Sequence, residues 1–160
     1  MRLIIALAIC LATPAAGEDL RFDATPTVSC LAESADQARE CIGRAATACM
    51  DQPGGDTTIG MGFCLDAELD LWDGKLNEVY QRLRADMTAQ DAARTDPAIS
   101  LAESLRDMQR AWIGYRDSRC GFETAQWHGG TGASPAFLGC TLLVTAEQTL
   151  YLQSLLQDQR

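Results

Sequence analysis

Residues 65–87 read LDAELDLWDGKLNEVYQRLRADM, and they carry the helical pattern from which the fold class is predicted. Its large apolar residues recur at steps of three and four along the chain; they are Leu65, Leu69, Trp72, Leu76, Val79, Leu83 and Met87. That spacing places them in one stripe on a helix, which we expect to span about Gly62–Thr88. Gly74 lies inside this helix at a cost of about 1 kcal/mol relative to alanine, and we expect it to admit a closely packed neighbouring helix.

Three further segments have helical patterns. Glu33–Met50 has a helical composition with Ser34 as N-cap, and the turn residues DQPGGD at 51–56 end it. A third helix is expected from Leu101 to about Ala125, with an apolar stripe of Leu101, Leu105, Met108, Trp112, Tyr115 and Phe122. After the glycine-rich loop 128–135, the inward positions of a fourth helix are expected to be Leu138, Leu142, Thr145, Leu150 and Leu155. Because no segment alternates like a strand, the sequence predicts an all-α, small disulfide-stapled bundle of about four helices.

The first residues resemble an export signal. Arg2 precedes a short apolar run, and small residues before Gly17 fit a cleavage site, so residues 1–17 are expected to be a signal peptide. Lipidation at Cys10 is disfavoured because Ile9 is too large for the preceding position. The apolar run is about half the roughly 20 residues of a membrane span. We expect residues 18–32 to be an extended lead-in and residues 33–160 to form the helical domain, in a periplasmic or secreted protein.

Removal of the signal leaves an even number of cysteines, which in an exported chain indicates three disulfides. On one straight helix, Cys41 and Cys49 would lie about 12 Å apart, beyond the roughly 7 Å that a disulfide spans, so this pair is excluded. Geometry leaves the other pairings of Cys30, Cys41, Cys49 and Cys64 open. The expected set is Cys30–Cys41, Cys49–Cys64 and Cys120–Cys140, the last of which would clamp the glycine-rich loop.

The charge of the chain limits its partners. Loss of Arg2 with the signal takes the formal charge from −9 to −10. Nucleic-acid binding is disfavoured, because a phosphate backbone requires a basic surface. A cationic partner would be attracted, although acidity also simply keeps an exported protein soluble.

The sequence contains no recognisable catalytic motif. The chain has one histidine, His128, in the glycine-rich loop, and a solvent-exposed loop histidine is the simpler interpretation. GGTG at 129–132 lacks the Lys-Ser/Thr of a phosphate-binding loop. Zinc is disfavoured by the cysteine spacing, and no pair of acidic residues is marked out for glycoside hydrolysis. We therefore expect no cofactor, no metal and no enzymatic activity.

Polar and aromatic residues gather on two helices instead. We expect a seam between them that fixes helix register, and whose exposed edge could also contact a partner. Arg116 would reach a carboxylate or amide of the long helix at Glu68, Asp73 or Asn77. The seam comprises Glu68, Trp72, Asp73, Asn77 and Tyr80 on one helix and Gln109, Arg110, Trp112, Tyr115, Arg116 and Asp117 on the other.

These motifs carry a family resemblance. ELDLWDGKLNEVYQRL at 68–83, SLRDMQRAWIGYRDSRCGFE at 104–123, GGTG and Cys140 occur in an order that resembles the LprI-type lysozyme-inhibitor domain family. The likeness is best over residues 64–150. Family members often carry arginine three residues after the Thr of the last helix, whereas here Thr145 is followed by Gln148. If that arginine pairs with a carboxylate, this chain lacks the pair or replaces it with an amide hydrogen bond.

The resemblance implies an exported helical protein, and in the named member it implies inhibition of lysozyme. We expect a monomeric binding protein that recognises a cationic lysozyme or another envelope protein. The stapled loop would present Trp127, His128 and Thr131, because rigid aromatic side chains are frequent anchors of interfaces. The alternatives are an envelope-accessory or structural domain without lysozyme activity, and, third, a carboxylate-dependent hydrolase.

Overall fold

The computed structural model describes residues 20–95 and 98–158, with the side chains of residues 35 and 36 excepted. Within these ranges it contains helices and no strand, so the expected all-α fold is confirmed. The elements are α1 (Thr25–Glu33), the 3₁₀ segment η1 (Ala35–Cys41), α2 (Arg44–Met50), α3 (Thr58–Ala93), α4 (Leu101–Ala125) and α5 (Ala133–Gln157). The expected signal peptide lies outside the described residues.

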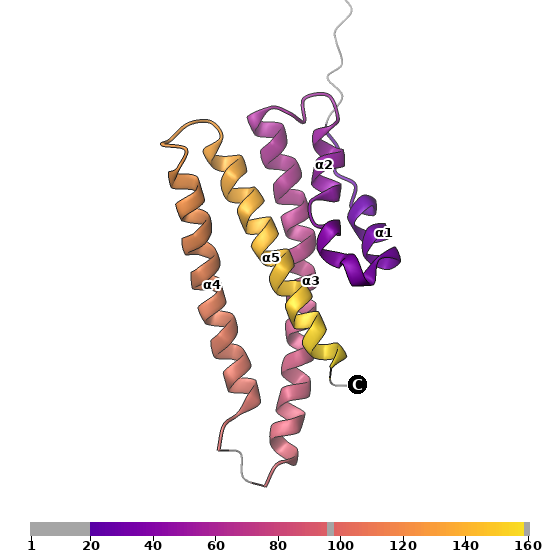
Figure 1. Ribbon diagram of the computed structural model, residues 1–160, viewed down its shortest axis with the longest axis vertical. Helices are drawn as coiled ribbons and strands as arrows, with labels where there is room; N and C mark the ends of the chain where they lie inside the picture. Colours follow the sequence, from indigo (N-terminus) through magenta and orange to yellow (C-terminus); the bar gives the residue numbers. More distant parts are fainter. Residues whose placement is uncertain (1–19, 96–97, 159–160) are drawn as a thin grey trace, which may run out of the picture.

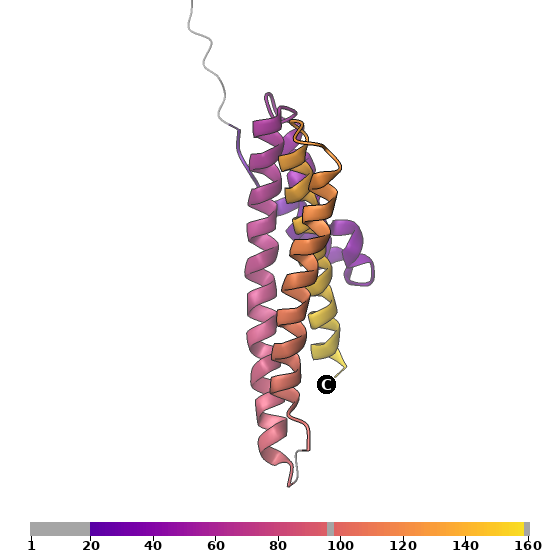
Figure 2. The same ribbon diagram turned by 90° about the vertical axis from the view of Figure 1, so that its left-hand side faces the viewer.

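The long helices α3, α4 and α5 run lengthwise beside one another and form the bundle (Figures 1 and 2). α3 has 36 residues and so is about 54 Å long. The N-terminal elements lie beside the half of the bundle where α3 begins (Figure 1). α2 packs on α3, α1 packs on α2 and η1, and η1 also contacts α5. α3 and α4 continue past the end of α5, so the far end of the bundle is a helical hairpin (Figure 1).

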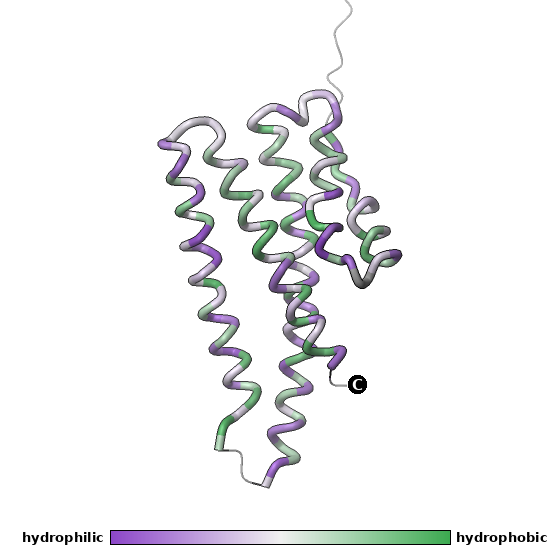
Figure 3. The backbone as a smooth tube through the Cα atoms, in the orientation of Figure 1, coloured by the Kyte–Doolittle hydropathy of each residue, from purple (hydrophilic) through white to green (hydrophobic). Residues whose placement is uncertain are grey.

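The core forms where α5 covers the predicted stripe of α3. Leu76, Val79 and Leu83 are buried together with Leu105 of α4 and Leu152 of α5. Nearer the beginning of α3, the fully buried Trp72 packs against α5. Figure 3 shows that α5 is largely apolar, whereas α4 carries many hydrophilic residues. One face of α4 therefore remains available to solvent.

The stripe expected on α4 is correct only in its first half. Leu105 is buried, but Tyr115 and Phe122 are exposed, which contradicts the expected stripe. The side of α4 that packs on α5 there includes Cys120, which bonds to α5, and the half-buried Arg119, which approaches Glu147 of α5. Helical rotation consequently turns Tyr115 and Phe122 outward.

Two N-terminal expectations are wrong. The lead-in 18–32 is not extended throughout, because α1 begins at Thr25 with a proline in its first turn, where a missing backbone N–H costs nothing. The expected single helix Glu33–Met50 is two elements, η1 and α2, and Ser34 makes no side-chain cap hydrogen bond. The break occurs at Gly43, whose φ of 85° is left-handed and accessible mainly to glycine.

The long helix extends beyond the expected Gly62–Thr88 at both ends. At its start, the Thr57 hydroxyl accepts a hydrogen bond from the Gly60 backbone N–H at 3.0 Å. Gly74 does not serve the expected close approach, because a Cβ there would meet no atom within 4 Å.

Three disulfides join successive elements, and they are the pairs expected from the sequence. Cys30–Cys41 joins α1 to η1, Cys49–Cys64 joins α2 to α3, and Cys120–Cys140 joins α4 to α5. Their Cα–Cα distances are 5.5, 5.6 and 5.4 Å, within the range that disulfides span.

Candidate functional site

The glycine-rich loop between α4 and α5 has a defined backbone. The Trp127 N–H donates to the Thr124 carbonyl at 3.1 Å, and the Gly130 N–H donates to the Trp127 carbonyl at 2.8 Å. His128 has a left-handed φ of 48°, unusual for a residue other than glycine, and Gly129 follows with a φ of 81°. Local hydrogen bonds therefore fold the loop into successive turns.

Trp127 is held in place by the loop itself. A Cβ built on Gly132 would lie 2.1 Å from the indole ring, so the ring rests directly on the glycine backbone. The side chain is nevertheless 52% exposed. Its position is thus restricted while much of its surface faces solvent, which is the property of an interface anchor.

Other large apolar side chains are exposed at the same end of the bundle, where α3 and α5 begin and α4 ends (Figures 1 and 2). We call this region the loop end. Its exposed apolar residues are Ile59, Phe63, Phe122, Trp127 and Phe137. His128 and Thr131 are exposed there as well. The structure thus brings the three predicted partner-binding residues together with apolar residues that the sequence had not singled out.

The predicted seam divides into two places. Glu68 and Trp72 do not face α4: both are fully buried, and Glu68 lies beneath the N-terminal elements. Its Oε1 accepts hydrogen bonds from the Thr27 hydroxyl at 2.8 Å, the Gly43 N–H at 2.9 Å and the Trp72 indole N–H at 3.1 Å. Its Oε2 accepts one from the Ala46 N–H at 2.6 Å.

These contacts make Glu68 the cap of α2. That helix begins after Gly43, which offers no side chain, so its first N–H groups need an acceptor from elsewhere. A carboxylate also suits the positive end of a helix. Sequence reasoning placed Glu68 in the seam and missed this role, because the donors belong to segments far from it in the chain.

Most of the remaining seam residues lie along a groove between α3 and α4, with a volume of about 590 Å³. The seam residues that line it are Asp73, Asn77, Tyr80, Gln109, Arg110, Trp112 and Arg116. Tyr115 and Asp117 lie outside it and are exposed on α4.

Arg116 does not make the expected contact with α3. Its Nη2 lies 2.9 Å from Asp117 Oδ1, and its guanidinium lies over the Trp112 ring, 5.2 Å from the centroid. Asn77 donates instead to Asp73 of its own helix at 3.1 Å. An arginine satisfied by its neighbour and by a ring face has little need of a cross-helix partner.

Gln148 makes the amide hydrogen bond that was one of the two expectations for this position, the other being loss of the contact. Its Nε2 donates to Gln109 Oε1 at 2.9 Å and joins α5 to α4. At the position where the resemblance led us to expect arginine, Gln148 thus makes a neutral hydrogen bond between α5 and α4.

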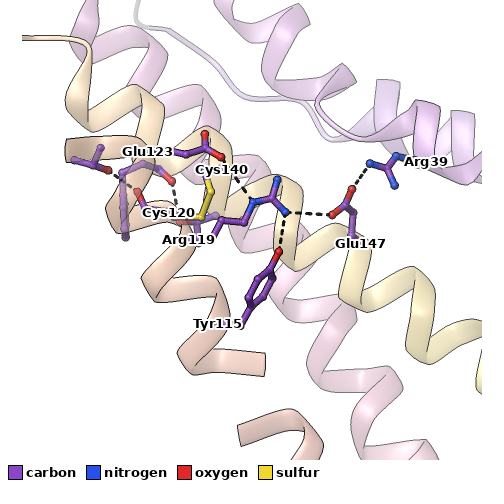
Figure 4. A network of polar contacts seen from close by, with 10 residues as sticks. Arg39, Tyr115, Arg119, Cys120, Glu123, Cys140 and Glu147 are labelled. Carbon is purple, nitrogen blue, oxygen red and sulfur yellow. Dashed lines mark hydrogen bonds and ion pairs between the residues drawn. A yellow bond between two sulfur atoms is a disulfide. The ribbon is translucent and has the colours of Figure 1, made fainter. Parts of the chain in front are cut away.

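A polar network that sequence reasoning missed connects three elements (Figure 4). Glu147 of α5 pairs with Arg39 of η1 and, at 4.0 Å, with Arg119 of α4. Arg119 also donates to the Tyr115 hydroxyl at 3.4 Å. This hydrogen bond, together with the negative charges of Glu147 and Glu123, raises the pKa of Arg119. The contacts of Arg119 with Tyr115 and Glu123 follow the i, i+4 spacing of α4, whereas no spacing in the sequence predicts the contacts with Arg39 and Glu147 from other elements.

The described residues offer no metal cluster, since no three His, Cys, Asp or Glu side chains among them are placed to hold an ion. No helix in the described part of the chain is long and apolar enough to cross a bilayer. A second groove, of about 440 Å³, is lined by residues of α3, α5 and the N-terminal elements. Each groove has one acidic lining residue, Asp73 or Glu78, so neither presents the carboxylate pair of a glycosidase.

Comparison with known proteins identifies the family. Residues 49–152, from the end of α2 to most of α5, match the sequence profile of the family described as lysozyme inhibitor LprI. The chain belongs to the LprI family. The profile covers α3, α4 and the loop end, whereas α1, η1 and most of α2 precede it. Glu68 therefore joins the LprI part of the chain to its N-terminal elements.

Two relatives of this LprI chain are bacterial proteins. An uncharacterized protein of Rhizobium meliloti (strain 1021) is 31% identical over 103 residues, which is 62% of this chain and 74% of the relative. An uncharacterized 17.7 kDa protein from the region 5′ of puhA in Rhodobacter capsulatus is 26% identical over 134 residues, 80% of this chain and 83% of the relative. No solved structure matches the chain significantly.

Proposed function

We propose that this LprI chain is an exported protein that binds lysozyme-type glycosidases and inhibits them through the loop end. The observation that carries the proposal is Trp127, half-exposed and fixed against Gly132. A side chain ordered before binding loses little conformational entropy on association. Trp127 would be the anchor, with His128 and Thr131 as its polar neighbours.

Charge supports the same partner. The chain carries a formal charge of −9, and a cationic lysozyme would be attracted to it. Such attraction is screened over about 8 Å at physiological ionic strength. Association should therefore slow as salt is added, whereas the apolar contact of Trp127 should be little affected.

Export is part of the proposal. The sequence of residues 1–17, the three disulfides and the family support a periplasmic or secreted protein. Disulfides persist in oxidising compartments. We propose that the protein acts there as a monomer and as a binding protein rather than an enzyme.

A turbidity assay tests the function. The oxidised protein is mixed with a panel of lysozymes while their lysis of bacterial walls is followed. We expect dose-dependent inhibition that weakens with salt, and an increase of about thirtyfold in the inhibition constant for Trp127→Ala, the loss typical of an interface hot spot.

Tyr151→Ala is the matched control. Tyr151 is 50% exposed, like Trp127, but lies on α5 near the end opposite the loop. The Tyr151→Ala variant should inhibit lysozyme as strongly as the wild type does. Equal losses in both variants would contradict the loop end as the binding surface. Folded protein that inhibits no lysozyme would contradict the proposal and favour an accessory envelope domain.

A further inference from the structure

The groove between α3 and α4 is lined by positively charged residues, whereas the chain as a whole is acidic. Four arginines line the groove, namely Arg84, Arg106, Arg110 and Arg116, against one acidic residue, Asp73. The chain as a whole is strongly acidic. This concentration of positive charge in a concave site marks the groove as a place for an anion.

The four arginines of the groove differ in whether they already have a carboxylate partner. Arg106 lies 3.2 Å from Asp107 and Arg116 lies 2.9 Å from Asp117, so both guanidinium groups already have a carboxylate partner. The side chains of Arg84 and Arg110 have no ion pair or hydrogen bond with any residue in the described part of the chain. One comes from α3 and the other from α4. An anion in the groove can therefore be held from both sides.

The uncharged lining residues suit a sugar ring. Tyr80 is half-buried and offers apolar ring surface, whereas the Arg116 guanidinium already lies over the Trp112 ring. Gln109 accepts a hydrogen bond from Gln148 through its oxygen, which fixes its amide and leaves its N–H₂ group as a donor. Aromatic surface beside a few fixed polar groups is the usual anatomy of a small-molecule site, and a volume of about 590 Å³ is within the range of such sites.

We propose that this groove binds a sugar that carries a carboxylate, with Arg84 and Arg110 binding the carboxylate and Tyr80 contacting the ring. Arginine suits this role because its planar fork matches a carboxylate. A polyanion such as a nucleic acid is a poor fit, because the net charge of −9 repels every phosphate outside the groove. A ligand with few charges feels mainly the arginines within a Debye length of about 8 Å.

Titration calorimetry tests this site. The full chain is expressed for export, and the oxidised protein is titrated with the disaccharide of N-acetylglucosamine and N-acetylmuramic acid, which carries a carboxylate on its lactyl ether. Chitobiose supplies similar rings without the charge, and inorganic phosphate supplies charge without the rings. We expect the disaccharide to bind at least about tenfold more tightly than chitobiose, since a hydrogen bond to a charged group contributes at least that factor. It should also bind more tightly than phosphate, which lacks the ring contacts.

Paired variants locate the binding. Arg84→Gln with Arg110→Gln should weaken disaccharide binding by at least about tenfold. Arg82→Gln with Arg44→Gln removes the same charge outside the groove and should bind like the wild type. Arg82 lies on α3 near Glu78, and Arg44 lies on α2, so the control does not touch α4. Circular dichroism confirms that each variant is folded.

Several results would overturn the site: no binding of the disaccharide to folded protein, equal binding of chitobiose, phosphate binding as tight as the disaccharide, or equal losses in both double variants. The proposal is independent of lysozyme inhibition. Arg84→Gln with Arg110→Gln should still inhibit lysozyme, and Trp127→Ala should still bind the disaccharide, so failure of one proposal is distinguishable from failure of the other.

Discussion

At the scale of single residues, Glu68 shows how one side chain can hold two parts of a protein together. It is 0% exposed and receives four hydrogen bonds, from α1, the turn before α2, α2 itself and its own helix. A buried carboxylate is costly unless its oxygens are satisfied. Here neutral donors satisfy both oxygens, and in return α2 gains the acceptors that its own sequence lacks.

Glu68→Gln tests this role. The glutamine can keep an oxygen toward Thr27, Gly43 and Trp72, but its N–H₂ group then faces the Ala46 N–H. A buried donor left without an acceptor costs about 1–3 kcal/mol, and we expect that loss in the free energy of unfolding measured with guanidinium chloride. Glu78→Gln changes an exposed residue of the same helix and should cost little. A loss as small as that of Glu78→Gln would contradict the capping role.

Asp91 acts at the other end of the bundle. Its carboxylate accepts hydrogen bonds from the Ala102 N–H at 3.0 Å, the Leu101 N–H at 2.9 Å and the Ser100 hydroxyl at 2.8 Å. The hydrogen bonds from Ala102 and Leu101 are the main cause of its lowered pKa. Asp91 thus ties the end of α3 to the first turn of α4.

The lowered pKa sets the sign of a pH dependence. A carboxyl group whose pKa is lower in the folded state stabilises above its unfolded pKa, about 3.9, and this contribution is lost as pH falls through the folded pKa. We expect Asp91→Asn to lower the Tm at pH 7 and to have a smaller effect near pH 2, which thermal unfolding at both pH values measures. Asp86→Asn, on an exposed part of α3, should leave the Tm at pH 7 nearly unchanged. An Asp91→Asn effect that is equal at both pH values would rule out the carboxylate as its source.

At the scale of elements, the loop end depends on a close approach between a ring and a glycine. Gly132→Ala should displace Trp127, because the added Cβ would lie 2.1 Å from the indole ring. We expect a red shift of tryptophan emission and weaker lysozyme inhibition, with the helices retained. Trp72 is fully buried in the core, so it should contribute no shift.

Gly74→Ala is the control for the same substitution. A Cβ there meets no atom within 4 Å, and the position is in the interior of α3. This variant should leave the emission unchanged and stabilise the protein by about 0.5–1 kcal/mol, the helix-propensity difference. A blue-shifted or unchanged emission in Gly132→Ala would contradict the packing of Trp127 on the glycine.

At the scale of the whole molecule, three disulfides crosslink neighbouring elements that are otherwise joined covalently only by the backbone. Cys120–Cys140 closes the segment that carries the loop, with a sequence separation of 20 residues. The chain-entropy model assigns such a crosslink about 3 kcal/mol. We expect Cys120→Ala with Cys140→Ala to lower the free energy of unfolding by about this amount, measured by denaturant titration.

The same variant connects stability to function. The α4–α5 pair remains packed through Trp112 and Val144, so the folded form should persist with a more mobile loop. Lysozyme inhibition should weaken at a temperature where circular dichroism shows the helices intact. Inhibition equal to the wild type would show that the crosslink supports the fold alone.

The sequence alone predicted the helical class and the bounds of α4 from Leu101 to Ala125. The cysteine pairs in the structure are the expected ones, although the reach of a disulfide left other pairings of the first four cysteines open. The helical class and the bounds of α4 depend on local information, namely apolar periodicity and turn residues. The expected helix Glu33–Met50 failed because helix propensity did not reveal the left-handed turn at Gly43.

Which side chains contact one another follows from the packing of the helices and could not be read from the sequence. In the folded chain, Glu68 caps α2 and does not contact α4. Tyr115 and Phe122 face solvent, and Trp127 packs on Gly132. Two arginines without an ion-pair partner, one on α3 and one on α4, line the same groove. Spacing along a chain fixes the faces of each helix, but the rotation of one helix against another is set by packing between residues far apart in sequence, and that rotation chooses the partners.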